Sequence, residues 1–85
     1  MNRPRLATGA RLQYDDVRSE HVLLIPEGVV RLNPTAAEVL GLCDGERTLE
    51  DVVGALTARY EGADVGDDVR ELVDAMVQRG LVVDA

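Results

Sequence analysis

The sequence predicts a small α+β domain of the winged-helix kind, in which a three-stranded antiparallel sheet is followed by three helices. Short apolar runs separated by turn residues extend from residue 11 to residue 32, and beyond residue 34 the apolar positions recur every three or four residues. Asn33-Pro34 marks the change, because Asn is a favoured N-cap and Pro fits the first helical position. The third strand, which ends there, should therefore lie beside the helices.

The strands are expected at residues 11–14, 21–25 and 29–32. Polar and apolar residues alternate in the first strand, so Leu12 and Tyr14 should point inward. The second strand is continuously apolar rather than alternating, which predicts that both of its faces are covered. Pro26-Glu27-Gly28 then turns the chain back toward the third strand.

The segment before the first strand has no periodicity. It contains Pro4 and Gly9 and lacks the apolar run of a targeting peptide. Residues 1–9 are therefore predicted to form a mobile or loosely docked arm of a single domain that spans residues 1–85.

Three helices are expected after Asn33. The first should run from residue 34 to about residue 43, and Thr48 with Asp51 forms a capping-box-like start for the second. The third should extend from about residue 65 to residue 79, with Gly80 just beyond its end. Its apolar stripe is wide enough to contact the core and still leave an exposed strip, which would be a candidate groove. The buried residues of the first helix are expected to be Ala36, Val39, Leu40 and Cys43.

Composition narrows the possible functions. The core must be aliphatic, because the chain has thirteen Val and eleven Leu but no Phe or Trp. A single cysteine and the absence of a long apolar stretch favour an intracellular, cytoplasmic protein that does not enter a membrane. The net charge is −7 and every cation is an arginine, which argues against a duplex DNA partner.

Catalytic chemistry finds little support in the sequence. His21 is the only histidine, and Cys43 occupies an apolar helical position typical of a buried thiol. The carboxylates fall at turns and helix starts, where capping and the helix dipole explain them. We therefore predict no enzyme activity, no catalytic residue, no metal site and no cofactor.

Two binding functions remain open. A sheet with a helix-turn-helix could bind a peptide along an exposed sheet edge, or it could be a winged-helix regulator that binds DNA. A DNA-reading helix needs basic and amide side chains, whereas the second and third helices offer mainly acidic ones. The charge therefore favours the peptide, with the DNA-binding regulator as the alternative.

Several short motifs, taken in order along the chain, resemble the PqqD family. They are Arg11-Leu12, Leu23-Leu24-Ile25-Pro26-Glu27-Gly28, Leu32-Asn33-Pro34-Thr35-Ala36, Cys43-Asp44-Gly45-Glu46-Arg47-Thr48, Asp68-Val69 and Arg79-Gly80-Leu81. The resemblance implies a non-enzymatic peptide chaperone, a recognition element for a ribosomal peptide. It would hold the precursor PqqA and present it to the radical S-adenosylmethionine enzyme PqqE, which joins a Glu and a Tyr of that peptide. Lasso-peptide recognition proteins share the Leu-Asn and Asp-Gly features, so another ribosomal peptide remains open as the ligand.

The same resemblance implies a location for the peptide, added as a strand beside the third strand and against the third helix. Val30 and Leu32 can equally be core strand residues, because one face of that strand must point inward. A flexible Met76, one turn from Leu72, would suit a groove that accepts a peptide. The implied peptide-binding residues are Val29, Val30, Arg31 and Leu32 on the strand, and Val69, Leu72, Val73 and Met76 on the helix.

Docking of the partner enzyme at Asp44 and Arg47 rests on the resemblance alone. Turn and cap chemistry explains both residues without a partner. The oligomeric state, monomer or homodimer, does not follow from the sequence.

Overall fold

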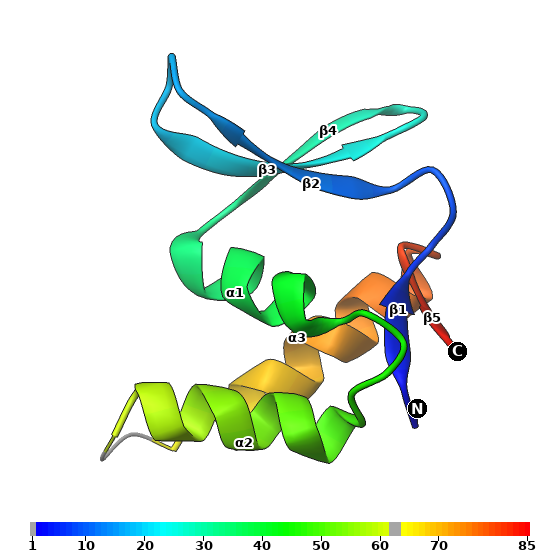
Figure 1. Ribbon diagram of the computed structural model, residues 1–85. Coiled ribbons are helices and arrows are strands. Elements are labelled where there is room, and N and C mark those ends of the chain that lie inside the picture. Colours follow the sequence, from blue (N-terminus) through cyan, green and yellow to red (C-terminus); the bar gives the residue numbers. More distant parts are fainter. Residues whose placement is uncertain (1, 62–63) are drawn as a thin grey trace.

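The computed structural model describes residues 2–61 and 64–85. The sheet formed by β2, β3 and β4 lies over the helices α1, α2 and α3, and the short strands β1 and β5 pair beside the helical layer (Figure 1). This arrangement confirms the predicted α+β class. The elements are β1 (Pro4–Leu6), β2 (Arg11–Asp15), β3 (Glu20–Ile25), β4 (Gly28–Leu32), α1 (Pro34–Leu42), α2 (Leu49–Arg59), α3 (Gly66–Gln78) and β5 (Val82–Asp84).

The N-terminal segment differs from the expected arm, because residues 4–6 form β1 and pair antiparallel with β5. Pro4 is fully buried. The Pro4 carbonyl accepts the Gly45 N–H at 2.9 Å, and the Asn2 carbonyl accepts the Leu49 N–H at 3.0 Å. The segment thus joins the C-terminus to the loop before α2.

Two further contacts complete this junction. The Asp84 carboxylate accepts the backbone N–H groups of Arg3 and Asn2, and these bonds lower its pKa, that of Arg3 the most. Gly45 has a φ of +81°, and a Cβ there would lie 3.1 Å from the Ala85 Cβ. A glycine is therefore required where the loop crosses β1.

The helix boundaries follow the predicted caps. The Asn33 side chain accepts the Ala36 N–H at 2.7 Å at the start of α1. Thr48 and Asp51 form a reciprocal capping box at the start of α2, each side chain accepting the other's N–H at 3.0 Å. These bonds satisfy N–H groups that have no partner inside the helix.

The end of α3 is a Schellman motif. Gly80 has a φ of +75° and donates its N–H to the Val77 carbonyl, while the Leu81 N–H reaches the Met76 carbonyl. The chain is thereby turned into β5, where Val82 is buried.

The core lies between the sheet and the helices, and it is aliphatic as predicted. Only one sheet face is covered by helices. Leu23 points at them, whereas Val22 faces the other way and is buried by neighbouring side chains. Tyr14 lies on the inner face, as expected, but at the border of the sheet it is 48% exposed, with its ring edge-on to His21. The core cluster comprises Leu23, Leu32, Ala36, Val39, Leu40, Cys43, Val52, Leu56, Val69, Val73, Met76, Leu81 and Val82.

Candidate functional site

The strand β4 is one edge of the sheet, since the strand order is β2-β3-β4. Its pairing with β3 begins at Ile25 and Gly28, across a two-residue loop. A two-residue hairpin closes on a hydrogen-bonded pair, and such pairs alternate along an antiparallel ladder with pairs that are not bonded. Val30 therefore bonds toward β3, and the N–H and C=O groups of Val29 and Arg31 point to the open edge.

The side chains of β4 alternate between the core face and the outer face of the sheet. Leu32 is buried and Val30 is partly buried against the core, while Val29 is 60% exposed and Arg31 is exposed on the outer face of the sheet. Arg31 lies 3.5 Å from the Glu20 carboxylate across the sheet. The open edge thus combines free backbone groups at Val29 and Arg31 with inward side chains at Val30 and Leu32.

A cleft of about 340 Å³ lies where β4 passes into α1, opposite the first turns of α3. Its walls are Asn33, Thr35 and Ala36 on one side and Asp68 and Leu72 on the other. Of the four helix residues implied by the resemblance, Leu72 alone lines this cleft. The cleft is large enough to admit a side chain, and its lining combines polar and apolar residues.

The other three helix residues lie in the core. Val69 is 2% exposed, Val73 is 0% exposed and Met76 is 7% exposed. The expectation that Met76 lines an open groove is therefore wrong for this structure, because β5 follows α3 closely and the last turn packs beneath it.

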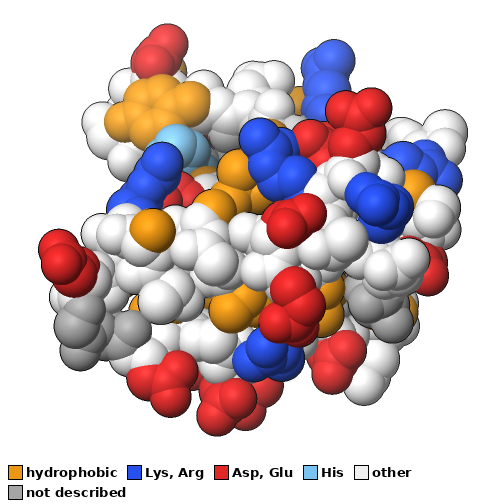
Figure 2. Space-filling view, turned by 60° about the horizontal axis from the view of Figure 1, so that its bottom comes forward, with side chains coloured by type: hydrophobic (Ala, Val, Ile, Leu, Met, Phe, Trp, Pro, Cys, Tyr) orange, Lys and Arg blue, Asp and Glu red, His pale blue; other side chains and the backbone are white. Residues whose placement is uncertain are grey.

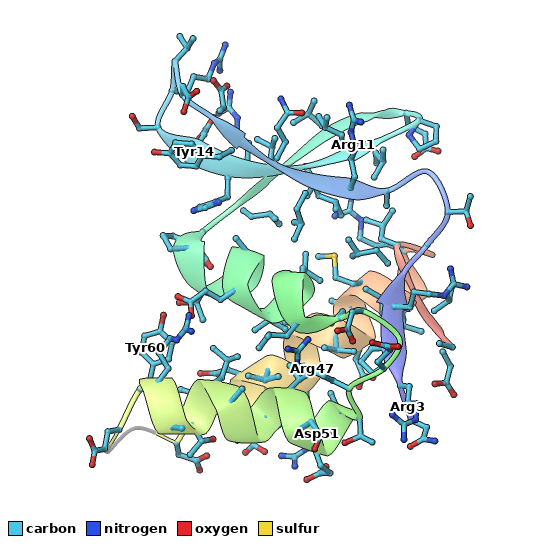
Figure 3. The ribbon with its side chains drawn as sticks, in the orientation of Figure 1. Arg3, Arg11, Tyr14, Arg47, Asp51 and Tyr60 are labelled. Atoms are coloured by element: carbon cyan, nitrogen blue, oxygen red, sulfur yellow. The ribbon has the colours of Figure 1, made fainter. Side chains whose placement is uncertain are left out.

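Asp44 and Arg47 lie in the turn before α2, where Asp44 also forms a backbone bridge with Arg5. The Asp44 carboxylate accepts the backbone N–H groups of Glu46 and Arg47, both at 3.0 Å, and the Arg47 guanidinium lies at 2.6 Å. These bonds, the Glu46 contact first, lower the pKa of Asp44. Figure 3 shows Arg3, Arg47 and Asp51 around the start of α2. The side chains of Asp44 and Arg47 remain partly exposed.

The helical side of the molecule is acidic. In Figure 2 acidic side chains gather along the lower edge of this face. The α3 carboxylates Asp67, Asp68, Glu71 and Asp74 are all exposed. Within the described ranges no helix is long and apolar enough to cross a membrane, and no three potential metal ligands are grouped.

A second hollow, which the sequence did not indicate, lies between β2 and α1. It has a volume of about 310 Å³, and its lining includes Leu12, Tyr14, Pro34, Ala37 and Glu38. The one signal for it in the sequence is Tyr14 itself, which is one of only two tyrosines in a chain without Phe or Trp. Figure 3 shows Tyr14 and Arg11 toward opposite ends of β2.

Glu38 connects this hollow to α2. Its carboxylate accepts the Tyr60 hydroxyl at 2.8 Å and the Arg59 guanidinium at 2.6 Å. The Tyr60 bond, followed by that of Arg59, lowers the pKa of Glu38. The carboxylate is thus held by α2 and is not presented as a free acid or base.

Comparison with known proteins identifies the family. The family model for coenzyme PQQ synthesis protein D (PqqD) matches residues 20–82. The chain belongs to the PqqD family. A PqqA binding protein of Azotobacter vinelandii is 39% identical over 80 residues, covering 93% of this chain and 87% of that protein. A PqqA binding protein of Methylococcus capsulatus is 36% identical over 72 residues, covering 85% of this chain and 77% of that protein.

Solved PqqD structures share the fold. The solution NMR structure of the PqqD truncation of Methylobacterium extorquens PqqCD, a stand-alone RiPP recognition element, has a TM-score of 0.74 at 33% identity and covers 94% of this chain and 87% of that one. The crystal structure of PqqD from Xanthomonas campestris has a TM-score of 0.57 at 36% identity, with coverage of 89% and 87%. The fold and the family thus agree with the resemblance found in the sequence.

Proposed function

We propose that this chain is a peptide chaperone that binds the precursor peptide PqqA as an added strand on the edge of β4 and presents it to the radical enzyme PqqE. The observation that carries the proposal is the open edge at Val29 and Arg31, which continues into the cleft beside Leu72. Main-chain bonds along an edge supply affinity, and pockets for alternate side chains supply specificity. Membership of the PqqD family and the names of the relatives support PqqA as the peptide.

Hydrogen exchange tests the edge directly. At saturating PqqA from the same genome, the amides of Val29 and Arg31 should gain protection, while that of Val30, already bonded to β3, should change little. Unchanged exchange at both edge residues would exclude strand addition at β4.

A pair of proline variants tests the same geometry by mutation. Arg31→Pro removes an N–H that points outward, so the domain should fold and bind PqqA at least tenfold more weakly. Arg31→Ala is the matched control for the lost side chain. Val30→Pro removes a bond within the sheet and should destabilise the fold instead. Normal PqqA affinity of folded Arg31→Pro would contradict the proposal.

Presentation to PqqE needs a surface that remains free when the peptide is bound. Asp44 and Arg47 are proposed docking residues, remote in sequence from β4 and partly exposed. Arg47→Ala should weaken PqqE binding and leave PqqA binding unchanged, with Arg79→Ala, also an exposed arginine, as control. Equal PqqE affinity of wild type and Arg47→Ala would remove this residue from the interface.

A further inference from the structure

The edge strand β4 carries a single charged side chain, that of Arg31, on the sheet face that no helix covers. This side chain is 67% exposed. Among the described residues its guanidinium meets one carboxylate, that of Glu20, which lies 3.5 Å from Nε. No hydrogen bond within the described chain uses its two terminal Nη groups, so they can donate to a further acceptor.

The outer face beside Arg31 is hollowed. The hollow has a volume of about 420 Å³, and its lining combines charged groups of both signs with Val22 and Val29. Val22 is the cross-strand partner of Arg31 and is only 6% exposed, so the aliphatic stem of the arginine helps to cover it. This packing and the Glu20 contact keep the Arg31 side chain on the outer face.

The free backbone groups of Val29 and Arg31 fix the side-chain directions of any strand added to β4. The residues directly opposite these two would form the hydrogen-bonded pairs of an antiparallel ladder. Residues directly opposite each other share one sheet face, with Cβ atoms about 4.5–5.5 Å apart. Two side chains of the added strand would therefore lie on the outer face, and the one between them, opposite Val30, would point inward.

The position opposite Arg31 favours a carboxylate. Opposite charges that face each other across an antiparallel pair attract, and like charges repel. The guanidinium can meet two carboxylates through separate N–H groups, with Nε toward Glu20 and the Nη groups toward the added strand. The position opposite Val29 meets a 60% exposed valine at the border of the hollow and suits an apolar side chain.

The inner side of the same edge carries the opposite charge. Asp68 of α3 is exposed and lines the cleft beside Leu72. A slip of the added strand by one residue turns each of its side chains to the other sheet face. A carboxylate would then leave Arg31 and approach Asp68, so the slip replaces an attraction by a repulsion. The two faces of the edge thus differ in the charge that they accept.

From these observations we propose that Arg31 sets the register of the bound peptide by pairing with an Asp or Glu of PqqA directly opposite it on the outer face of the sheet. The inference rests on the proposed addition of PqqA to β4. In an antiparallel strand the acidic residue would stand two positions before an apolar residue that covers Val29. Because the pair is exposed, its contribution decreases as the salt concentration rises.

A charge swap between protein and peptide tests the pairing. Each Asp and Glu of PqqA from the same genome is replaced singly by Lys, and each peptide is titrated into wild type and Arg31→Glu at low salt. Arg31→Glu should bind unmodified PqqA roughly tenfold more weakly than wild type does. At one acidic position the Lys peptide should show the reverse preference and bind Arg31→Glu roughly tenfold more tightly than wild type.

Arg11→Glu is the matched control, since Arg11 lies on the outer face of β2 at the other border of the sheet. It changes the net charge equally, and its affinity for PqqA should stay within about twofold of wild type. Arg31→Gln adds no carboxylate beside Glu20 and should fall between wild type and Arg31→Glu. Equal losses in the two glutamate variants, or the lack of any Lys peptide that prefers Arg31→Glu, would overturn the inference.

Hydrogen exchange separates that failure from a failure of the proposed function. If PqqA protects the amides of Val29 and Arg31 in wild type but no acidic position couples to Arg31, strand addition stands and the pairing falls. If PqqA protects neither amide, both fall.

Discussion

The packing of Met76 makes a quantitative prediction. The side chain is 7% exposed within the core cluster, so Met76→Ala leaves a cavity among Val69, Val73 and their neighbours. Truncation of a buried Met to Ala costs about 2–5 kcal/mol. An 85-residue domain has a total stability of roughly 4–13 kcal/mol, so the loss is a large fraction of it. At about 4–8 °C for each kcal/mol, the midpoint should fall by roughly 10 °C or more.

The control for this prediction is Leu72→Ala, one turn earlier on α3. Leu72 is only partly buried and borders the cleft, so its truncation should cost less stability and weaken PqqA binding more. Circular dichroism melts give the stability, and titration with PqqA well below both midpoints gives the affinity. A Met76→Ala protein that melts within a few degrees of wild type yet binds PqqA tenfold more weakly would refute the core assignment.

Three further outcomes follow from the caps, the thiol and the carboxylates. Thr48→Ala removes half of the capping box and should lower the free energy of unfolding by about 1 kcal/mol, measured by urea titration. Cys43 should react with a thiol reagent at least a hundredfold more slowly in the native protein than in urea, since burial raises its pKa to about 11. Hydrogen bonds from backbone N–H groups lower the pKa values of two carboxylates. The largest effect on Asp44 comes from the N–H of Glu46, and the largest effect on Asp84 comes from the N–H of Arg3. The two carboxylates therefore contribute fully to the free energy of unfolding above pH 3.8, their ordinary pKa, and this contribution is lost as the pH falls through their lower pKa values in the folded protein. The urea concentration at the unfolding midpoint should therefore decrease once the pH falls below about 4, and it should decrease less in Asp84→Asn. A midpoint that does not change with pH down to 3 would contradict this.

The features that the sequence predicted well depend on neighbours within a few residues. The side chains of Asn33 and Thr48 each accept a backbone N–H three residues further along the helix that they cap, and Gly80 ends α3 through bonds to the last turn of that helix. The hairpin at Pro26-Glu27 likewise fixes the register of β3 with β4. Such features can be predicted from the sequence because the residue and its hydrogen-bond partner lie within a few positions of each other.

The β1–β5 pair could not be predicted in this way. It joins Leu6 to Val82 and Pro4 to Asp84, residues at opposite ends of the chain, and each strand is three residues long. Neither strand contains enough positions to show an alternating pattern. What holds β1 in place is the burial of Pro4 and the backbone groups of the loop before α2, none of which has a signature in the N-terminal sequence itself.

On α3 the spacing of apolar residues does not distinguish core positions from positions on a binding surface. A wide stripe predicts only that some side chains are covered. In this small domain α1, α2 and β5 pack against α3, and Leu72 and Val77 are the apolar residues of the helix that stay partly exposed. A peptide on β4 would therefore meet α3 through Leu72 and Asp68 rather than along the length of the helix. Its affinity should then depend chiefly on backbone pairing at Val29 and Arg31, which tolerates sequence change in the peptide, while the residue entering the cleft sets the specificity.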